Sequence, residues 1–192
     1  MIRYFKITGA LVCFLLVLAG CGSTSTHTIT SFSPVGASAG TQITIYGTGF
    51  DSNPSNNLVA FTGAQPVPAT SSSATMIVVT VPTGAATGVV MTSTDGGPEI
   101  TSPASFIVLA QPAFYPNSGS IGTTITITGT NFDPTPTNNV VTFNGIPATV
   151  ISSSPTQIVT TVPTGATNGP IVINVDGGTY ILTAANSFSI SQ

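Results

Sequence analysis

One pattern of about 80 residues occurs twice in this chain of 192 residues. The stretch Gly40-Thr41-Gln42-Ile43-Thr44-Ile45 returns 82 positions later as Gly122-Thr123-Thr124-Ile125-Thr126-Ile127. A repeat with a fixed period of this length indicates two structural units of the same kind. We therefore expect two domains, at residues 29–109 and 114–192, joined by a short linker at residues 110–113. Pro112 stiffens that linker, so an end-to-end rod with limited hinge freedom is expected.

Each repeat is predicted to consist of short β-strands. Apolar and polar residues alternate with a period of two around Ile43 and Ile45, and again around Val59 and Phe61, which is typical of half-buried strands. The sequence Asp-Gly-Gly at residues 95–97 and 176–178 is a strong hairpin signal. After the first twenty residues no segment has a helical period. Regular short strands separated by Gly, Pro and Asn favour an all-β fold of two β-sandwiches.

An ordered set of glycine, proline and apolar positions then points to a family. In the first repeat it consists of Pro34, Gly40-Thr41, Ile43, Ile45, Gly47, Phe50, Val59, Phe61, Gly63, Val81-Pro82 and Phe106. In the second repeat it consists of Pro116, Gly122-Thr123, Ile125, Ile127, Gly129, Phe132, Val141, Phe143, Gly145, Val162-Pro163 and Phe188. The set resembles the IPT/TIG family of immunoglobulin-like domains. The resemblance implies two tandem immunoglobulin-like β-sandwiches, although the last strand lacks the Phe-x-Tyr ending that the family often has.

The N-terminus reads as an export signal. Arg3 and Lys6 precede an apolar run at residues 7–17, which is too short to span a membrane. The following Leu18-Ala19-Gly20-Cys21 resembles the lipobox of bacterial lipoproteins. The resemblance implies a signal peptide at residues 1–20, a lipid on Cys21 and a tether at residues 21–28. Because Gly22 rather than Asp follows the lipidated residue, we expect the protein at the outer membrane. The alternative to a lipobox is an ordinary signal peptide with a chance cysteine.

Composition excludes several classes of partner. No Lys or Arg follows Lys6, and only 4% of the chain is charged. Binding to nucleic acid needs cationic side chains against phosphate, so nucleic acid is excluded as a partner. Cys13 is expected to leave with the signal peptide and Cys21 to carry lipid, so no disulfide is predicted.

The residues that carry enzyme chemistry are also scarce. Nucleophilic catalysis needs a base held beside the nucleophile, yet the single histidine, His27, falls in the predicted tether. The carboxylates pair only as repeat equivalents about one domain apart, which does not make a catalytic dyad. We therefore predict that the protein is not an enzyme and has no cofactor.

One weak metal hypothesis remains. In each repeat one loop carries oxygen ligands that calcium prefers, at Asp51 and Asn53 in the first repeat and at Asp133 and Asn138 in the second. Each loop has only one carboxylate and contains proline, so turns closed by Asx side chains are the better explanation. We therefore predict no metal site.

The remaining candidates are surfaces. Most phenylalanines recur between the repeats and should be core, whereas Tyr46, Tyr115 and Tyr180 do not recur and are the candidate contacts for a glycan. Sheet edges without Lys favour strand pairing with a partner or with a second copy. The alternative is a passive spacer, with edges guarded by Pro66, Pro68, Pro98 and Pro103. We expect a structural or protein-interaction lipoprotein of the cell envelope; the alternative is a glycan-binding accessory lipoprotein.

Overall fold

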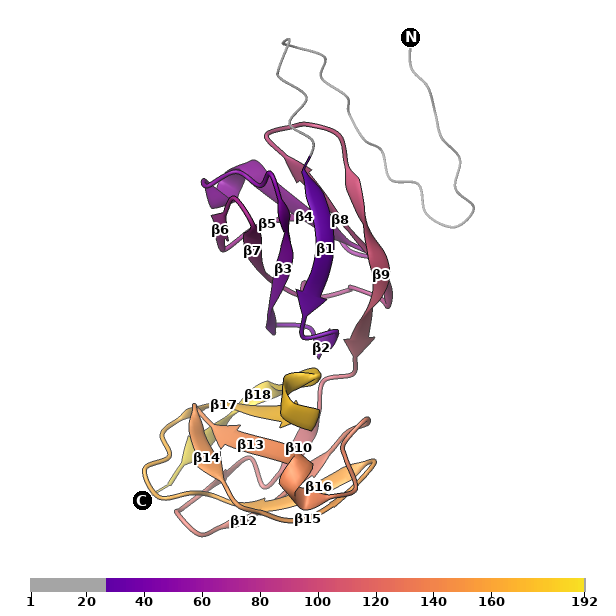
Figure 1. Ribbon diagram of the computed structural model, residues 1–192. Helices are drawn as coiled ribbons and strands as arrows, with labels where there is room; N and C mark the ends of the chain where they lie inside the picture. Colours follow the sequence, from indigo (N-terminus) through magenta and orange to yellow (C-terminus); the bar gives the residue numbers. More distant parts are fainter. Residues whose placement is uncertain (1–26, 192) are drawn as a thin grey trace.

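The computed structural model describes residues 27–191, which form two β-sandwiches stacked end to end (Figure 1). These residues contain no α-helix and only three single-turn 3₁₀ helices: η1 (Pro54–Asn56), η2 (Pro136–Asn138) and η3 (Asp176–Gly178). In the described part, no helix is long and apolar enough to cross a membrane. The all-β prediction is confirmed. The predicted signal peptide and the lipidation site at Cys21 lie outside the described residues.

One layer of each domain is a four-stranded antiparallel sheet. In the first domain the strand order is β1 (Thr28–Ser33), β3 (Gln42–Thr48), β7 (Met76–Thr80) and β6 (Ser71–Ser73). In the second domain the order is β10 (Ala113–Tyr115), β12 (Thr124–Thr128), β16 (Gln157–Thr161) and β15 (Val150–Ser154). The alternation predicted these faces correctly, since Ile43 and Ile45 of β3 are fully buried, as are Ile125 and Ile127 of β12.

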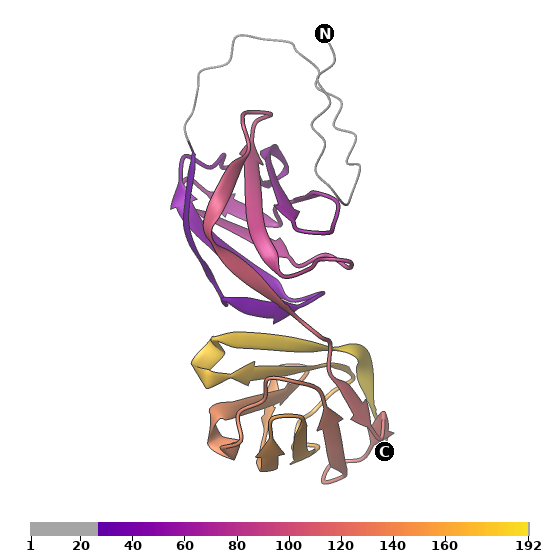
Figure 2. The ribbon, with the colours of Figure 1, turned by 90° about the vertical axis from the view of Figure 1, so that its right-hand side faces the viewer.

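The other layers of the two domains are joined into a single sheet. The first domain contributes β2 (Gly36–Ser38), β9 (Ile100–Leu109), β8 (Gly88–Thr94), β4 (Asn57–Phe61) and β5 (Val67–Pro68). The second contributes β14 (Ile146–Ala148), β13 (Asn139–Phe143), β17 (Gly169–Val175), β18 (Tyr180–Ile190) and the side strand β11 (Ser118–Gly119). The order is β14-β13-β17-β18-β2-β9-β8-β4-β5, so β18 of the second domain lies beside β2 of the first. Figure 2 shows β18 in yellow crossing beneath the first domain.

Recurring phenylalanines form the centre of each core. In the first domain, the rings of Phe32 and Phe61 both pack edge-to-face with the ring of Phe106. Their centroids lie 5.5 Å and 5.7 Å from that of Phe106. In the second, Phe188 and Phe143 are 5.2 Å apart and nearly perpendicular. Edge-to-face contacts of this kind add to the free energy gained from burying the rings. The prediction that these aromatic residues are core is therefore confirmed.

The repeated Gly-x-x-Phe sequence has a direct steric reason. The ring of Phe50 packs over Gly47, where a Cβ atom would lie 2.7 Å from the ring and would also overlap the carbonyl oxygen of Thr28. In the second domain a Cβ atom on Gly129 would lie 2.7 Å from the ring of Phe132. The glycine is thus required by close packing of the phenylalanine onto its own strand.

The hairpin prediction is confirmed at both Asp-Gly-Gly sequences. Asp95 and Gly96 have positive φ angles of 52° and 69°, and Asp176 and Gly177 have values of 53° and 66°. Two successive residues in this left-handed region match the twist of the flanking strands. The turns connect β8 to β9 and β17 to β18.

The domain limits differ slightly from those expected. His27, which the sequence placed in the tether, is only 2% exposed. Its Nε2 atom lies 3.0 Å from the carbonyl oxygen and 3.1 Å from the hydroxyl of Thr92 on β8, and its ring packs near Phe50. His27 is therefore packed against the first domain. Ala113 already belongs to β10, which shortens the linker to residues 110–112.

Replacing Gly47 with alanine is expected to destabilise the first domain by about 1–3 kcal/mol, the usual cost of overpacking a core. The measurement is urea unfolding followed by circular dichroism. Ser52→Ala, an exposed change in the loop that follows, is the control and should shift the free energy of unfolding by less than about 0.5 kcal/mol. A Gly47→Ala variant as stable as this control would contradict the steric explanation.

Candidate functional site

The junction between the domains depends on a three-residue strand. In β2, Gly36 and Ala37 pair in parallel register with Tyr180 and Ile181 of β18. On its other side, β2 pairs with β9 over its whole length. Gly36, Ala37 and Ser38 are all buried as a result. The hydrogen-bonded sheet of the first domain thus continues into the second domain. A flexible linker alone would not fix the two domains in this way.

Hydroxyl side chains complete this junction. The backbone N–H of Thr183 donates to Ser38 Oγ at 2.8 Å, and Ser38 Oγ donates to the carbonyl oxygen of Thr183 at 3.3 Å. The hydroxyls of Thr41 and Thr183 are 2.9 Å apart. Sequence reasoning missed these three residues. The available signal was their repetition, since Ser120 and Thr123 stand 82 positions after Ser38 and Thr41.

Gly36 allows the close approach of both neighbouring strands, β9 and β18. A Cβ atom at this position would lie 2.9 Å from both Cβ and the carbonyl oxygen of Ile107, and 3.0 Å from the ring of Tyr180. Tyr180 is accordingly half-buried at the junction and packs against the core of the second domain. Its ring therefore contributes to the contact between the domains.

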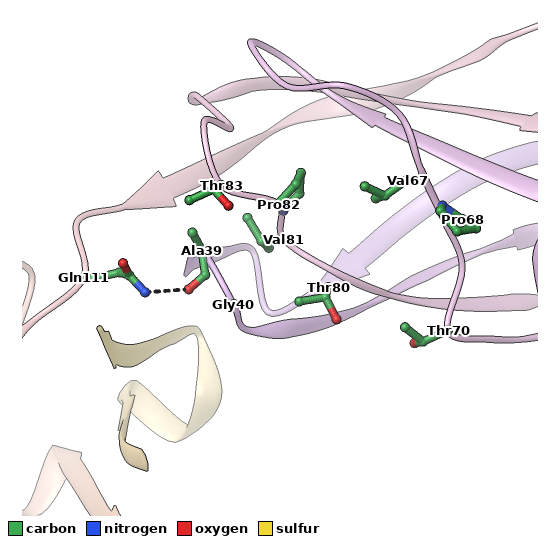
Figure 3. A pocket seen from close by; sticks show the side chains of 10 residues that line it. All are labelled: Ala39, Gly40, Val67, Pro68, Thr70, Thr80, Val81, Pro82, Thr83 and Gln111. Atoms are coloured by element: carbon green, nitrogen blue, oxygen red, sulfur yellow. Dashed lines mark hydrogen bonds between the residues drawn. The ribbon is translucent and has the colours of Figure 1, made fainter. Parts of the chain in front are cut away.

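A cavity of about 410 Å³ lies beside this junction (Figure 3). The linker residue Gln111 closes one side, where its Nε2 atom donates to the carbonyl oxygen of Ala39 at 3.0 Å. The other lining residues are mostly apolar and belong to the first domain: Gly40, Val67, Pro68, Thr70, Thr80, Val81, Pro82 and Thr83. No titratable side chain lines it, so this cavity offers no acid–base chemistry.

In the first domain, the loop proposed for calcium is filled by its own hydrogen-bond donors. Asp51 Oδ1 accepts from the backbone N–H of Asn53 at 2.7 Å, and Asp51 Oδ2 accepts from the amide of Asn56 at 3.3 Å. The amide of Asn57 donates to the carbonyl oxygens of Asp51 and Asn53. These donors point where a cation would need oxygen atoms. The loop is an Asx turn of the kind that the sequence favoured.

The matching loop in the second domain is closed by equivalent Asp and Asn bonds to the backbone. Asp133 Oδ1 accepts from the backbone N–H of Thr135 at 2.7 Å, and the Asn139 amide donates to the carbonyl oxygen of Asp133 at the same distance. The hydrogen bond from the Thr135 N–H lowers the pKa of Asp133 below its usual 3.8. Partial burial opposes this effect, and a hydrogen bond from Asn138 adds to it. Within residues 27–191, no three His, Cys, Asp or Glu side chains gather as a metal ion would require.

The three candidate tyrosines lie in three different sheets. Tyr46 is on β3 of the first domain and is exposed. Tyr115 is on β10 of the second domain and is 80% exposed. Tyr180 is on β18 at the junction. The structure therefore does not bring the three rings together on one face, and Tyr115 is the most accessible of them.

The free edges of the sheets differ in how they are protected. The joined sheet ends in β5 and β14, which contain Pro68 and Pro147, and a proline cannot donate to an added strand. The four-stranded sheets end on one side in β6 and β15, which carry neither proline nor charge. Of the other prolines expected to guard edges, Pro66 and Pro98 lie outside strands and Pro103 lies inside β9.

The family model for the IPT/TIG domain matches residues 28–108 and again residues 112–190. The chain belongs to the IPT/TIG domain family. The two matched segments coincide with the two sandwiches, so each IPT/TIG domain is one structural repeat. No curated protein matches the chain.

Several solved structures are similar to these IPT/TIG domains. An auxiliary nutrient binding protein from Bacteroides thetaiotaomicron is 25% identical over 41% of this chain and 20% of its own length, with a TM-score of 0.39. The extracellular region of plexin A4 is 22% identical over 92% of this chain and 16% of its own, with a TM-score of 0.48. SGBP-B, from a complex xyloglucan utilization locus in Bacteroides uniformis, is 20% identical over 85% and 49%, with a TM-score of 0.31.

These structural similarities cover only part of the similar proteins. This chain spans between 18% and 21% of the length of the first three proteins that it matches. All the TM-scores given above lie below 0.5, so none of them decides a function for this chain.

Replacing Gly36 with valine is expected to separate the two IPT/TIG domains, because the new side chain would meet both Ile107 of β9 and Tyr180 of β18 and displace β2 from its place between them. Differential scanning calorimetry should then show two unfolding transitions in place of one, and X-ray scattering should show a larger radius of gyration. Ala39→Ser, in the adjacent loop, is the control. A single unchanged transition in Gly36→Val would contradict a junction that depends on this close approach.

The lowered pKa of Asp133 predicts a defined pH dependence. The carboxylate contributes stability above pH 3.8, and this contribution is lost as the pH falls through the lower pKa of the folded state. Asp133→Asn should therefore lower the free energy of unfolding at pH 7 but make little difference at strongly acidic pH. Urea unfolding across this range is the measurement, and an equal loss at every pH would contradict the prediction.

Proposed function

We propose that this protein is a non-enzymatic lipoprotein of the cell envelope whose two IPT/TIG domains bind another protein. In this proposal the lipid on Cys21 anchors the chain, and the short tether limits how far the domains lie from the membrane. The outer membrane is the expected location. Membership of the IPT/TIG family and the lipobox-like Leu18-Ala19-Gly20-Cys21 support the arrangement of an anchored binding module.

The observation that carries the proposal is the combination of a fixed junction with open sheet edges. Because β2 and β18 hold the domains together, surfaces on both domains keep a constant relative position. Strands β6, β11 and β15 each pair on one side only. Exposed backbone groups on such edges can accept a strand from a partner. Ile151 on β15 and Ile121, just after β11, add exposed apolar side chains beside these edges.

The surface is also suited to contacts that do not depend on charge. The only charged side chains after residue 6 are five carboxylates: Asp51, Asp95, Glu99, Asp133 and Asp176. Binding through backbone hydrogen bonds and apolar contacts is weakly affected by salt, unlike binding through exposed charges. We therefore propose a partner that contributes an uncharged strand.

Capture from intact cells tests this proposal. The lipidated protein is cross-linked in place, and bound proteins are identified by mass spectrometry. Ile121→Lys or Ile151→Lys should reduce the capture of a specific partner, because a charge on an edge opposes strand addition. Val140→Lys, an exposed change on the face of the joined sheet, is the matched control. Capture that no edge substitution affects would contradict binding through edges.

A glycan-binding accessory role is the second candidate, favoured by the 80% exposure of Tyr115. An exposed aromatic ring is the usual platform for a sugar. The soluble chain from Ser23 onward is applied to a glycan array, with Tyr115→Ala and Tyr46→Ala beside it. Binding that is lost in Tyr115→Ala would establish this role and displace the protein-binding proposal.

A further inference from the structure

The second domain repeats the half of the junction that belongs to the first. Strand β2 pairs with β9 through Gly36 and Ile107, and β11 pairs with β18 through Ser118 and Ser189, 82 positions later in both strands. Strand β11 is therefore the structural equivalent of β2. Yet β2 has a strand on each side, whereas β11 pairs only with β18.

The backbone hydrogen bonds at the two positions also match. The N–H of Thr41 donates to the carbonyl oxygen of Ser38 at 3.2 Å, and that of Thr123 donates to Ser120 at 3.0 Å. The glycines between them match as well. Gly40 and Gly122 each donate a backbone N–H to a valine carbonyl oxygen, that of Val81 or Val162, at 2.9 Å. The backbone that carries the Ser–Thr pair thus has the same form in both domains, although the side chain of Thr123 lies over Gly119, where the first domain has Ala37.

The exposure of the two positions differs. In the first domain Ser38 is 0% exposed and Thr41 is 6% exposed, because β18 covers them. In the second domain Ser120 is exposed and Thr123 is half-buried. Between them, Ile121 is 54% exposed, which is unusual for a large apolar side chain outside an interface. The second domain therefore has an edge that is equivalent to the one at the junction and is not covered within residues 27–191.

We propose that this surface, the β11 edge (Ser118–Gly119 with Ser120 and Thr123), binds the last strand of an immunoglobulin-like domain on another chain. The inference rests on the proposed function and specifies its partner. The partner strand lies parallel to β11, as β18 lies parallel to β2, and the hydroxyls of Ser120 and Thr123 bond to it as Ser38 and Thr41 bond to Thr183.

The side chains specify what this partner strand contains. A threonine at the position of Thr183 satisfies both hydroxyls, as it does within the chain. The two residues that pair with β11 carry no charge, because their equivalents are Tyr180 and Ile181. Ser118 stands where the first domain has Gly36, next to the ring of Tyr180. The partner therefore has a side chain smaller than tyrosine at the first paired position.

A second unmodified copy of this chain does not fit the description. Thr101 is the equivalent of Thr183, because it pairs with Met91 as Thr183 pairs with Val172, and it is exposed. However, Pro98 and Glu99 occupy the positions of Tyr180 and Ile181. Proline has no N–H to donate, and an unpaired carboxylate is costly to bury. These two residues prevent the chain from adding to itself head to tail.

This obstacle provides a direct test. The double variant Pro98→Ala with Glu99→Ile gives the first domain a strand start that the β11 edge accepts. The soluble chain from Ser23 onward, carrying both changes, should form head-to-tail oligomers whose size rises with concentration in sedimentation velocity. Within one chain the linker holds the two strands at an effective concentration of about millimolar. Two separate chains have no such linker, so association is expected only at high protein concentration. The unmodified chain should stay monomeric over the same range.

A second pair of substitutions locates the contact. Adding Ser120→Ala and Thr123→Val to the double variant should restore the monomer, whereas Ser71→Ala and Ser73→Ala on β6 should leave the oligomers intact. Oligomers that survive the loss of Ser120 and Thr123 would overturn the proposal. A folded double variant that stays monomeric at the highest concentration would do so as well.

A binding measurement on the unmodified chain covers the case in which the double variant does not fold. A peptide with the sequence of residues 179–186, with alanine in place of Tyr180, is added to the chain. Its concentration is about millimolar, which matches the effective concentration that a short linker provides. Amide resonances of residues 118–123 should shift in NMR spectra, and the absence of any shift there would overturn the proposal. If cell capture still depends on Ile151, the proposed function stands although the β11 edge does not bind.

Discussion

The arrangement of this molecule depends on a three-residue strand that is paired on both sides. Strand β2 lies between the last strand of its own domain and the last strand of the next, so two sandwiches share one sheet. Two residue pairs and a cluster of hydroxyls hold this contact, and Ile107 and Leu109 of β9 add apolar packing against the core of the second domain. The relative orientation of the domains, and therefore the spacing of every exposed surface, follows from this contact.

Hydrogen bonds between side chains and the backbone do the work that ion pairs do in other proteins. With no Lys or Arg after residue 6, the loops are closed by Asp and Asn side chains bonded to backbone atoms. The buried Asn57 and Asn139 each bind backbone groups on both sides of a turn. Such bonds are directional and lose little strength in salt, so they fix loop geometry without a surface network of charges.

The sequence was informative wherever structure is decided by neighbouring residues. Alternation around Ile43 and Ile125 predicted which side chains are buried, and Asp-Gly-Gly predicted both hairpins. The Gly-x-x-Phe repeat identified a glycine whose steric reason, the ring packed over Gly47, became visible only in the structure.

Contacts between distant residues could not be predicted in this way. His27 resembled part of a tether because its partner, Thr92, is 65 residues away. Tyr180 resembled a surface aromatic because nothing near it in the chain indicates Gly36 as its neighbour. The junction residues recur between the repeats, but recurrence alone does not tell a core position from a contact between domains.

The junction also sets an order of events as the chain emerges and folds. Ser38 and Thr183 are 145 residues apart, and β18 is the last strand of the chain's second domain. All the other strands of the first domain are complete long before its β2 can be covered. The pairing is therefore a late step, which waits until the last strand of the second domain is made. Until then, the first domain exposes on β2 the same kind of open edge that the second domain keeps on β11.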